Sequence, residues 1–254
     1  FLQQEASFDI GETILSYQPT DTYTRALLVG LLNSLRVAIA GIFLTTIVGI
    51  TVGITRLSDN WLVRNISLVY VEIFRNTPLL LQLFFWYFAV FLSLPKVDHK
   101  ASVLGLIKFS QNGIELLGLN FSPEFSTLLL GLTFYTASFI AEIVRGGIQS
   151  VAKGQWEAGR SLGLKPSLIM RLVVLPQALR VIVPPLTSQY LNLAKNSSLA
   201  IAIGYPDIYF VASTTFNQTG KAVEVMLLIM LIYLTFSLII SFFMYLLNRT
   251  VQIQ

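Results

Sequence analysis

Residues 26–54 form one apolar stretch, ALLVGLLNSLRVAIAGIFLTTIVGITVGI, in which Arg36 is the only charged side chain. A helix crosses the hydrocarbon core of a bilayer in about 20 apolar residues, so this stretch is long enough to span with tilt. Further apolar stretches follow, and only 12% of the chain is charged, against about 25% in a soluble domain. With a mean hydropathy of +0.71, the sequence predicts a polytopic, all-α membrane protein.

Five spanning helices are predicted, within a transmembrane domain at residues 25–254. Residues 1–24 hold four acidic residues and no Lys or Arg, and their start, FLQQEASFDIGET, is unlike a signal peptide. We expect them to form an external N-terminal segment, with an amphipathic helix within 55–78 and a polar external loop at 95–122. Small residues four apart within 41–53 predict close packing of the first span against another helix. The expected spans are residues 26–54, 79–94, 124–148, 168–204 and 224–247.

The distribution of basic residues predicts the orientation, because Lys and Arg gather on the cytoplasmic side of membrane proteins. The segments after the first, third and fifth spans hold eight basic residues, and the other connecting segments hold five. We therefore expect residues 1–24 outside and the C-terminus in the cytoplasm. The two sets are Arg56, Arg64, Arg75, Lys153, Arg160, Lys165, Arg171 and Arg249, and Arg25, Lys96, Lys100, Lys108 and Lys221.

Several chemistries are excluded by residue content. The chain has no Cys and a single His, His99, which falls in the predicted loop and is expected to be a solvated loop residue. Disulfides, thiolate metal sites and His-based metal clusters are therefore excluded. No catalytic residue or metal ligand is predicted.

Ionisable residues inside spans are costly, so each is a functional candidate. Arg36, Glu142, Arg180 and Lys195 qualify. Arg36 could simply pair with Glu142, and Arg180 could extend to the cytoplasmic interface. Lys195 lies near the middle of its span, which favours a role in a transport pathway.

Polar side chains share one face of segment 186–204. In a helix, Ser188, Asn192 and Lys195 follow an i, i+4, i+7 pattern, and Gln189, Asn192 and Asn196 an i, i+3, i+7 pattern. This face must contact other helices or a wet path, and the neutral members are equally explained by hydrogen bonds between helices. Pro184 and Pro185 would open the backbone just before it, as in the broken helices of transporters. The candidate pathway residues are Glu142, Ser188, Gln189, Asn192, Lys195, Asn196, Ser197 and Ser198.

The cytoplasmic segment 153–172 has the pattern of a helix, a tight turn and a second helix. QWEAGRSLGL can form about two helical turns, and Gly163 allows a left-handed stop. Pro166 suits the first turn of a new helix, SLIMRLVVLPQAL, that continues into the membrane. Without further information, the same residues also fit an ordinary interfacial loop.

Residues 157–176, EAGRSLGLKPSLIMRLVVLP, resemble the EAA motif of permease subunits in ABC importers. The family pattern is Glu-Ala-Ala, three residues, Gly, nine residues, then Ile-x-Leu-Pro. The spacing from Glu157 to Gly163 and Pro176 is kept, whereas Gly159 replaces the second Ala and Val173 replaces Ile. Segments 74–88, 141–159 and 193–204 resemble the polar amino acid permease branch, and residues 8–38 its general L-amino acid subgroup.

The resemblance implies a fold like that of type I ABC importer permeases, in the bacterial cytoplasmic (inner) membrane. The short cytoplasmic helix would dock on an ATPase subunit, and closure of the ATPase dimer would rock the spans around a central site. The implied ATPase-coupling residues are Gln155, Glu157, Ala158, Gly159, Arg160, Gly163 and Leu164. The chain has no G-x-x-x-x-G-K-[ST] loop, so ATP and Mg would be bound by the partner ATPases and no cofactor by this chain.

The implied partners are a homologous permease, expected to form a heterodimer, the ATPase dimer, an external (periplasmic) amino acid-binding protein, the lipid bilayer and an L-amino acid substrate. No nucleic acid partner is expected. The carboxylate of a zwitterionic substrate would suit Lys195 or the N-terminus of a broken helix. Its ammonium group would suit Glu142 or carbonyl oxygens.

Three other classes of protein remain open. A secondary transporter or channel would share the spans and the intramembrane charges, but gives no reason for the spaced Gly and Pro residues of 157–176. An integral membrane enzyme lacks a catalytic pair or metal cluster to support it. A structural scaffold leaves Lys195 and Asn196 unexplained. An ATPase that co-purifies with the chain would separate the importer from the secondary transporter.

Overall fold

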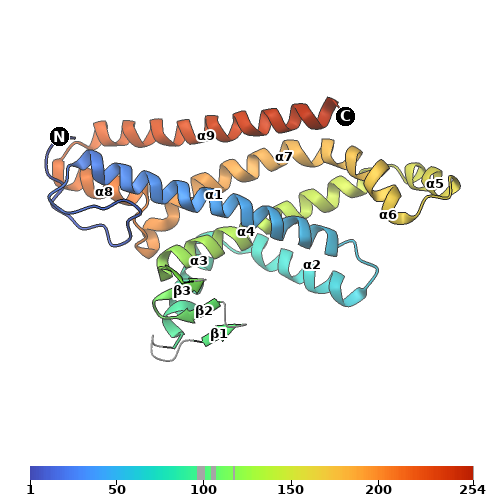
Figure 1. The fold of residues 1–254 in the computed structure, drawn as a ribbon, viewed down its shortest axis with the longest axis horizontal. Helices are drawn as coiled ribbons and strands as arrows, with labels where there is room; N and C mark the ends of the chain where they lie inside the picture. Colours follow the sequence, from blue (N-terminus) through green and yellow to red (C-terminus); the bar gives the residue numbers. More distant parts are fainter. Residues whose placement is uncertain (96–100, 104–106, 117, 254) are drawn as a thin grey trace. The chain divides into compact units, whose positions relative to one another are not determined.

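The computed structural model describes residues 1–95, 101–103, 107–116 and 118–253 (Figure 1). The long helices are α1 (Tyr23–Thr55), α4 (Pro123–Gln149), α7 (Leu175–Asn196) and α9 (Ala222–Ile253). The shorter ones are α2 (Trp61–Asn76), α3 (Leu79–Phe84), α5 (Lys153–Ser161), α6 (Pro166–Ile169) and α8 (Ile208–Thr219). π-helical turns cover Phe85–Val90 and Met170–Val174, and 3-10 turns cover Phe91–Ser93 and Ser197–Ile203.

Four helical runs are long and apolar enough to cross a membrane. They are Tyr23–Thr55, Pro123–Gln149, Pro166–Ile203 and Ala222–Gln252. The remaining predicted span, 79–94, corresponds to the run Leu79–Ser93, which meets the same test only together with α2. The two are bent by 109° and form either one broken span or a re-entrant loop. The predicted fold class, an all-α membrane protein with about five spans, is confirmed at this level.

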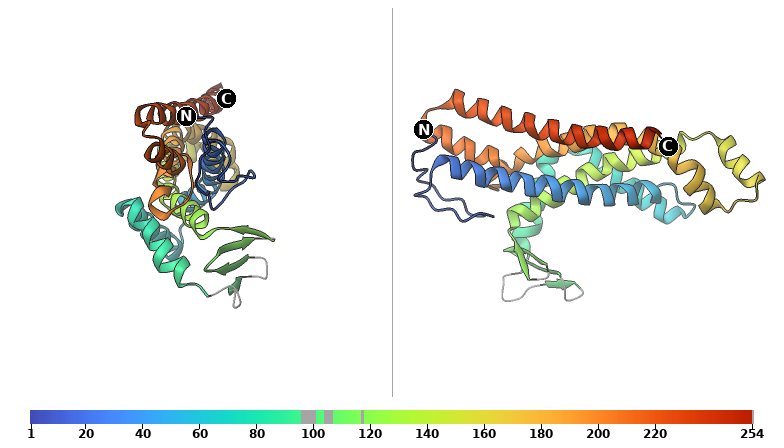
Figure 2. Two further views of the ribbon diagram at one scale, coloured as in Figure 1. Left: turned by 90° about the vertical axis from the view of Figure 1, so that its left-hand side faces the viewer. Right: turned by 45° about the horizontal axis from the view of Figure 1, so that its top comes forward.

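The predicted external loop contains a small antiparallel sheet instead of irregular chain. Strands β1 (Ala101–Val103), β2 (Ile107–Ser110), β3 (Gly113–Leu116) and β4 (Leu119–Phe121) pair in that order and lie side by side (Figure 2). Ser110 pairs with Gly113 across a two-residue turn, and Gly113 has a φ of +100° that favours glycine. An ion pair of 2.8 Å joins Lys108 to Glu115 across the strands. His99 lies outside the described residues.

The chain divides into two compact units, each described by itself. Unit 1 comprises Phe1–Phe43, Thr77–Thr133 and Leu193–Thr235, and unit 2 comprises Leu44–Asn76, Phe134–Asn192 and Phe236–Gln254. The four long helices therefore each contribute one part to each unit.

In unit 1 the N-terminal segment is part of the core. Ala6 and Ile10 are buried in one cluster with residues of α1, α8 and the start of α9. Main-chain hydrogen bonds from Ala6 N to Asp21 O (2.8 Å) and from Ser7 N to Pro19 O (2.8 Å) fold the segment back on itself. Residues 1–22 are therefore a packed extension of this unit.

In unit 2 the small residues of α1 allow α4 to approach closely. A Cβ at Gly49 would lie 2.6 Å from the side chain of Ile140, and one at Gly53 would lie 2.8 Å from Val144. Both distances are too short for a real side chain, so the predicted close packing of the first span is confirmed here.

Candidate functional site

Segment 153–172 folds as the predicted helix, turn and helix (Figure 1). Gly163 has a φ of +73° and ends α5 in a Schellman motif, in which Leu164 N donates to Gly159 O (3.1 Å) and Gly163 N to Arg160 O (2.9 Å). Pro166 then begins α6, where its missing N–H costs nothing. Glycine and proline therefore fix where each helix ends and begins.

Gly159 is the one buried residue of α5, and it packs against Ile169 of α6. A Cβ at position 159 would lie 2.8 Å from Cγ1 of Ile169, whose side chain is fully buried. Gly159 therefore sets how closely α5 approaches α6, and it faces α6 and not the outer surface of α5.

The other predicted coupling residues lie on the outer surface of α5 and its turn. Gln155, Glu157, Ala158, Arg160 and Gly163 are exposed, and Leu164 is half-buried. Leu162 was not among the predicted coupling residues, although its side chain is 79% exposed at the end of α5. A large apolar residue directly before the glycine of a helix stop was the available signal, because the Schellman turn projects it outward.

Glu142 lies in a cluster of arginines within unit 2. Its carboxylate pairs with Arg56 and also accepts from Arg145 at 2.7 Å, while Arg145 donates to Gln149 at 2.6 Å. Burial and then the charge of Arg145 lower the pKa of Arg56, but an arginine stays charged. Both carboxylate oxygens of Glu142 are thus engaged by cations.

The predicted pairing of Arg36 with Glu142 is wrong. Arg36 instead donates to Glu12 Oε1 at 2.5 Å, and its guanidinium lies over the ring of Phe125, 3.9 Å from the centroid. The competing partner comes from the N-terminal segment, which folds back onto α1 and supplies the carboxylate of Glu12. Arg180, expected near the interface, is exposed.

The predicted pathway residues follow the continuous helix α7 and the 3-10 turn after it. Ser188, Asn192 and Lys195 are exposed, and Gln189, Asn196 and Ser198 are half-buried. Lys195 makes no ion pair among the residues that the structure describes. The hydroxyl of Ser197, which is buried, donates to Ala194 O at 2.8 Å, and that of Ser198 to Lys195 O at 2.8 Å.

The break in this segment lies later than predicted. Pro184 and Pro185 are both inside α7, because two adjacent prolines remove only two N–H donors and the rest of the ladder continues. Instead, α7 ends at Asn196 and is followed by a 3-10 turn. That turn ends at Gly204, which has a φ of +76°. The 3-10 turn therefore follows Lys195, whereas the two prolines before Lys195 leave α7 continuous.

Comparisons with known proteins agree with this architecture. Residues 41–253 match the family described as the inner membrane component of binding-protein-dependent transport systems. The general L-amino acid transport system permease protein AapQ of Rhizobium johnstonii is 42% identical, over 96% of this chain and 81% of that protein. The putative amino-acid ABC transporter permease protein YhdX of Escherichia coli is 40% identical, over 100% of this chain and 85% of that protein.

Solved structures show the same fold. A crystal structure of an amino acid ABC transporter with histidines matches with a TM-score of 0.71 and 27% identity, over 90% of this chain and 95% of that chain. The MetNI methionine ABC transporter, in an inward-facing conformation, matches with a TM-score of 0.68 at 22% identity, over 93% of this chain and 99% of that chain, which concerns the fold alone. The chain therefore belongs to the family of binding-protein-dependent inner membrane transport components, among the amino acid ABC transporter permeases.

Proposed function

We propose that this chain is the non-catalytic, membrane-spanning subunit of an ATP-driven L-amino acid importer. It forms a translocation pathway with a second, homologous permease in a heterodimer and receives its substrate from an external binding protein. Partner ATPase subunits bind ATP and Mg and drive the cycle through α5. The chain lies in the bacterial inner membrane with residues 1–24 outside and its C-terminus in the cytoplasm.

The exposed surface of α5 is the observation that carries this proposal. Leu162 projects 79% of its surface from a helix end fixed by the Gly163 turn, with Glu157 and Arg160 exposed beside it. An exposed apolar side chain with a charged rim is typical of an interface anchor. Because Gly159 packs against the fully buried Ile169, a force applied to α5 passes directly to the chain that continues into α7.

Replacement of the anchor tests the proposal. In the importer purified with its partners, Leu162→Asp should abolish co-purification of the ATPase and stop ATP-driven amino acid uptake in proteoliposomes. Leu119→Asp is the matched control, since Leu119 is 64% exposed on β4 and lies outside the coupling segment. A Leu162→Asp protein that retains its ATPase and its uptake would refute the coupling role of α5.

The names of the relatives support the proposed substrate class: they include general L-amino acids and, for a 37% identical protein of Rhodobacter capsulatus, glutamate, glutamine, aspartate and asparagine. We assign the substrate carboxylate to Lys195, which is exposed and makes no ion pair among the described residues. The ammonium group is assigned to side-chain oxygens of the neutral residues near it, such as Asn192 and Asn196. Glu142 is held by two arginines, so its geometry favours a structural ion pair.

Lys195→Ala should therefore lower uptake at least tenfold without loss of ATPase binding, and Lys221→Ala, an exposed lysine before α9, should not. The secondary transporter remains the alternative, and it predicts uptake driven by an ion gradient without ATP. Uptake that persists in proteoliposomes with a gradient but no ATP would favour that alternative.

A further inference from the structure

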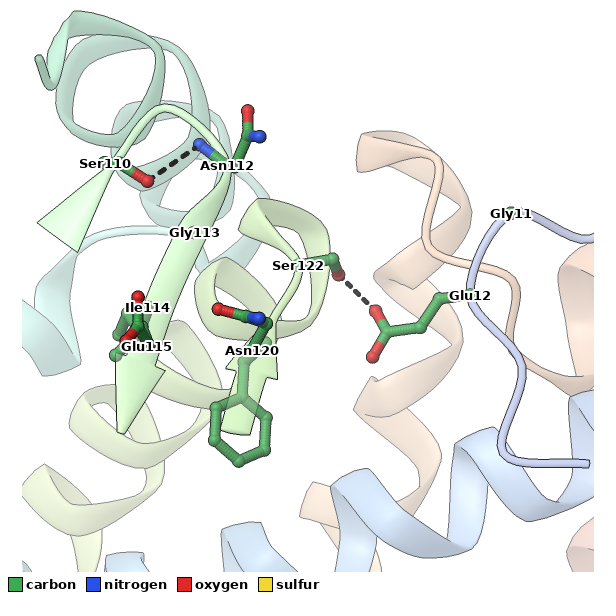
Figure 3. Close-up of a pocket in the computed structure, with 10 residues that line it drawn as sticks. Gly11, Glu12, Ser110, Asn112, Gly113, Ile114, Glu115, Asn120 and Ser122 are labelled. Atoms are coloured by element: carbon green, nitrogen blue, oxygen red, sulfur yellow. Dashed lines mark hydrogen bonds between the residues drawn. The ribbon is translucent and has the colours of Figure 1, made fainter. Parts of the chain in front are cut away.

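A pocket of about 430 Å³ lies in unit 1, outside the coupling segment and the polar face of α7 (Figure 3). Gly11 and Glu12 of the N-terminal segment form one wall, and strands β2 to β4 with Ser122 form the other. Its volume falls in the range of about 300–1,000 Å³ that is usual for sites of small ligands.

Several hydrogen bonds hold the Glu12 wall in place. The Glu12 carboxylate pairs with Arg36 and accepts from the hydroxyl of Ser122 (Figure 3), and its main-chain oxygen accepts from Asn33 Nδ2 at 2.9 Å. The Ser122 hydroxyl oxygen also accepts from Phe125 N at 3.0 Å, at the start of α4. These hydrogen bonds therefore hold this wall of the pocket in position in the absence of a ligand.

The polar groups facing the pocket are mainly acceptors. Glu12 and Glu115 both line it, together with the exposed amide of Asn120, and no Lys or Arg is among the described residues that do. The cations Arg36 and Lys108 pair with the two carboxylates without lining the pocket. The charges of the two pairs thus cancel overall, while the lining includes their acidic members and not their cations.

This arrangement suits the ammonium group of a molecule without net charge. An ammonium group brings three donors and no acceptor, and each carboxylate can accept about four hydrogen bonds, more than the contacts described for Glu12. A net cation would gain less, because Arg36 and Lys108 would repel its excess charge. The amide of Asn120 can donate to the carboxylate end of the same molecule.

We propose that this pocket binds a free zwitterionic amino acid by its ammonium group, as a site separate from Lys195. The inference rests on the proposed function in one respect, namely that the ligand is of the transported class. It adds an external contact for the substrate that involves the N-terminal segment.

Gly11 allows a side chain to be added at one wall of the pocket without a clash. A Cβ at Gly11 meets no atom within 4 Å, so Gly11→Leu adds an apolar side chain at this lining position of an otherwise intact chain. Thr13→Leu is the matched control, because Thr13 is exposed two residues away and does not line the pocket. Glu115→Gln tests the charge with nearly unchanged shape.

The experiment measures binding of radiolabelled L-glutamine to the complete importer in nanodiscs, without the external binding protein and in a Lys195→Ala background. We expect saturable binding that Gly11→Leu weakens at least tenfold, that Glu115→Gln weakens severalfold and that Thr13→Leu leaves unchanged. N-acetyl-L-glutamine, which lacks the ammonium group, should not compete.

Three outcomes would overturn the proposal. These are no binding to the parent protein, equal affinity in the Gly11→Leu protein, and competition by N-acetyl-L-glutamine. If free amino acid does not bind but Gly11→Leu weakens docking of the external binding protein, the pocket belongs to that protein interface and the proposal is also wrong. Failure of the proposed function itself would show separately, as absence of ATP-driven uptake in the unmodified importer.

Discussion

The two carboxylate oxygens of Asp207 lie in different environments. Its Oδ1 accepts from Phe210 N at 2.8 Å and so caps α8, whereas its Oδ2 is buried with no hydrogen-bond partner among the described residues. Burial raises the pKa of Asp207 from 3.8 to about 7. A carboxyl group that is neutral when folded and ionised when unfolded makes stability depend on pH.

The sign of this dependence is a prediction. Between about pH 4 and pH 7 the unfolded chain holds fewer protons at this position than the folded chain, so the free energy of unfolding should fall as the pH rises and level off above the folded pKa of about 7. Asp207→Asn keeps the Oδ1 cap without a charge, and should remove this loss and raise Tm at pH 8 more than at pH 5. Thermal unfolding in detergent measures it, and relative to Asp207→Asn the Asp207→Ala protein should be less stable by about 1 kcal/mol at every pH because the cap is lost.

Ion-pair partners were the least predictable feature of the sequence at this scale. Arg36 and Glu142 were each recognised as costly inside a span, but the pairing depended on chain segments whose return could not be foreseen. Glu12 reaches Arg36 because residues 1–22 fold onto α1, and the apolar residues that pack there, such as Ala6, Phe8 and Ile10, alternate with polar ones in the sequence. The sequence showed that these charged residues are costly inside a span, whereas the partners that neutralise them depend on the tertiary fold.

Among the elements, those marked by glycine or proline were the most predictable. The stop at Gly163 and the restart at Pro166 were expected and occur, because each residue restricts the backbone whatever surrounds it. The β-sheet within 101–121 was missed, since its strands have only three or four residues and show little alternation. The prediction that the α7 prolines open the helix was wrong, because neighbouring turns of a long helix can absorb a local loss of hydrogen-bond donors.

The turn after α5 makes a prediction about coupling. Gly163→Ala should strain the left-handed position by about 1–2 kcal/mol and loosen the end of α5. Gly154→Ala, which has open space and no such backbone conformation, should be neutral. Hydrogen exchange of the α5 amides in the purified importer should be faster in the first variant only. Equal protection in both would mean that the turn does not stabilise α5.

Packing of α1 on α4 supports a second prediction at this scale. Gly49→Leu inserts a side chain where even a Cβ would lie 2.6 Å from Ile140, so it should destabilise the importer by about 1–3 kcal/mol through overpacking. Gly146→Leu on α4, where nothing lies within 4 Å, is the matched control. Their Tm values in detergent should differ by several degrees, and equal values would contradict the close contact.

At the scale of the whole molecule, the number of spans decides where the two ends lie. Four helical runs qualify by themselves, and a fifth only if α2 and Leu79–Ser93 form one broken span. With four spans both ends face the same side of the membrane, and with five they face opposite sides. The proposed orientation, with the N-terminal segment outside and the C-terminus in the cytoplasm, requires five.

Because the chain has no Cys, single-cysteine variants can test this directly. Thr20→Cys and Gln252→Cys place exposed thiols near the two ends, while Leu119→Cys and Leu162→Cys, at 64% and 79% exposed positions, report on the sheet and on α5. A membrane-impermeant maleimide added to intact spheroplasts should label positions 20 and 119, and should label 162 and 252 only after the membrane is opened. If positions 20 and 252 are labelled from the same side, the broken pair does not cross the bilayer. In that case the helical run Leu79–Ser93 would enter and leave on one face, and the coupling assignment would depend on the side from which Leu162 reacts.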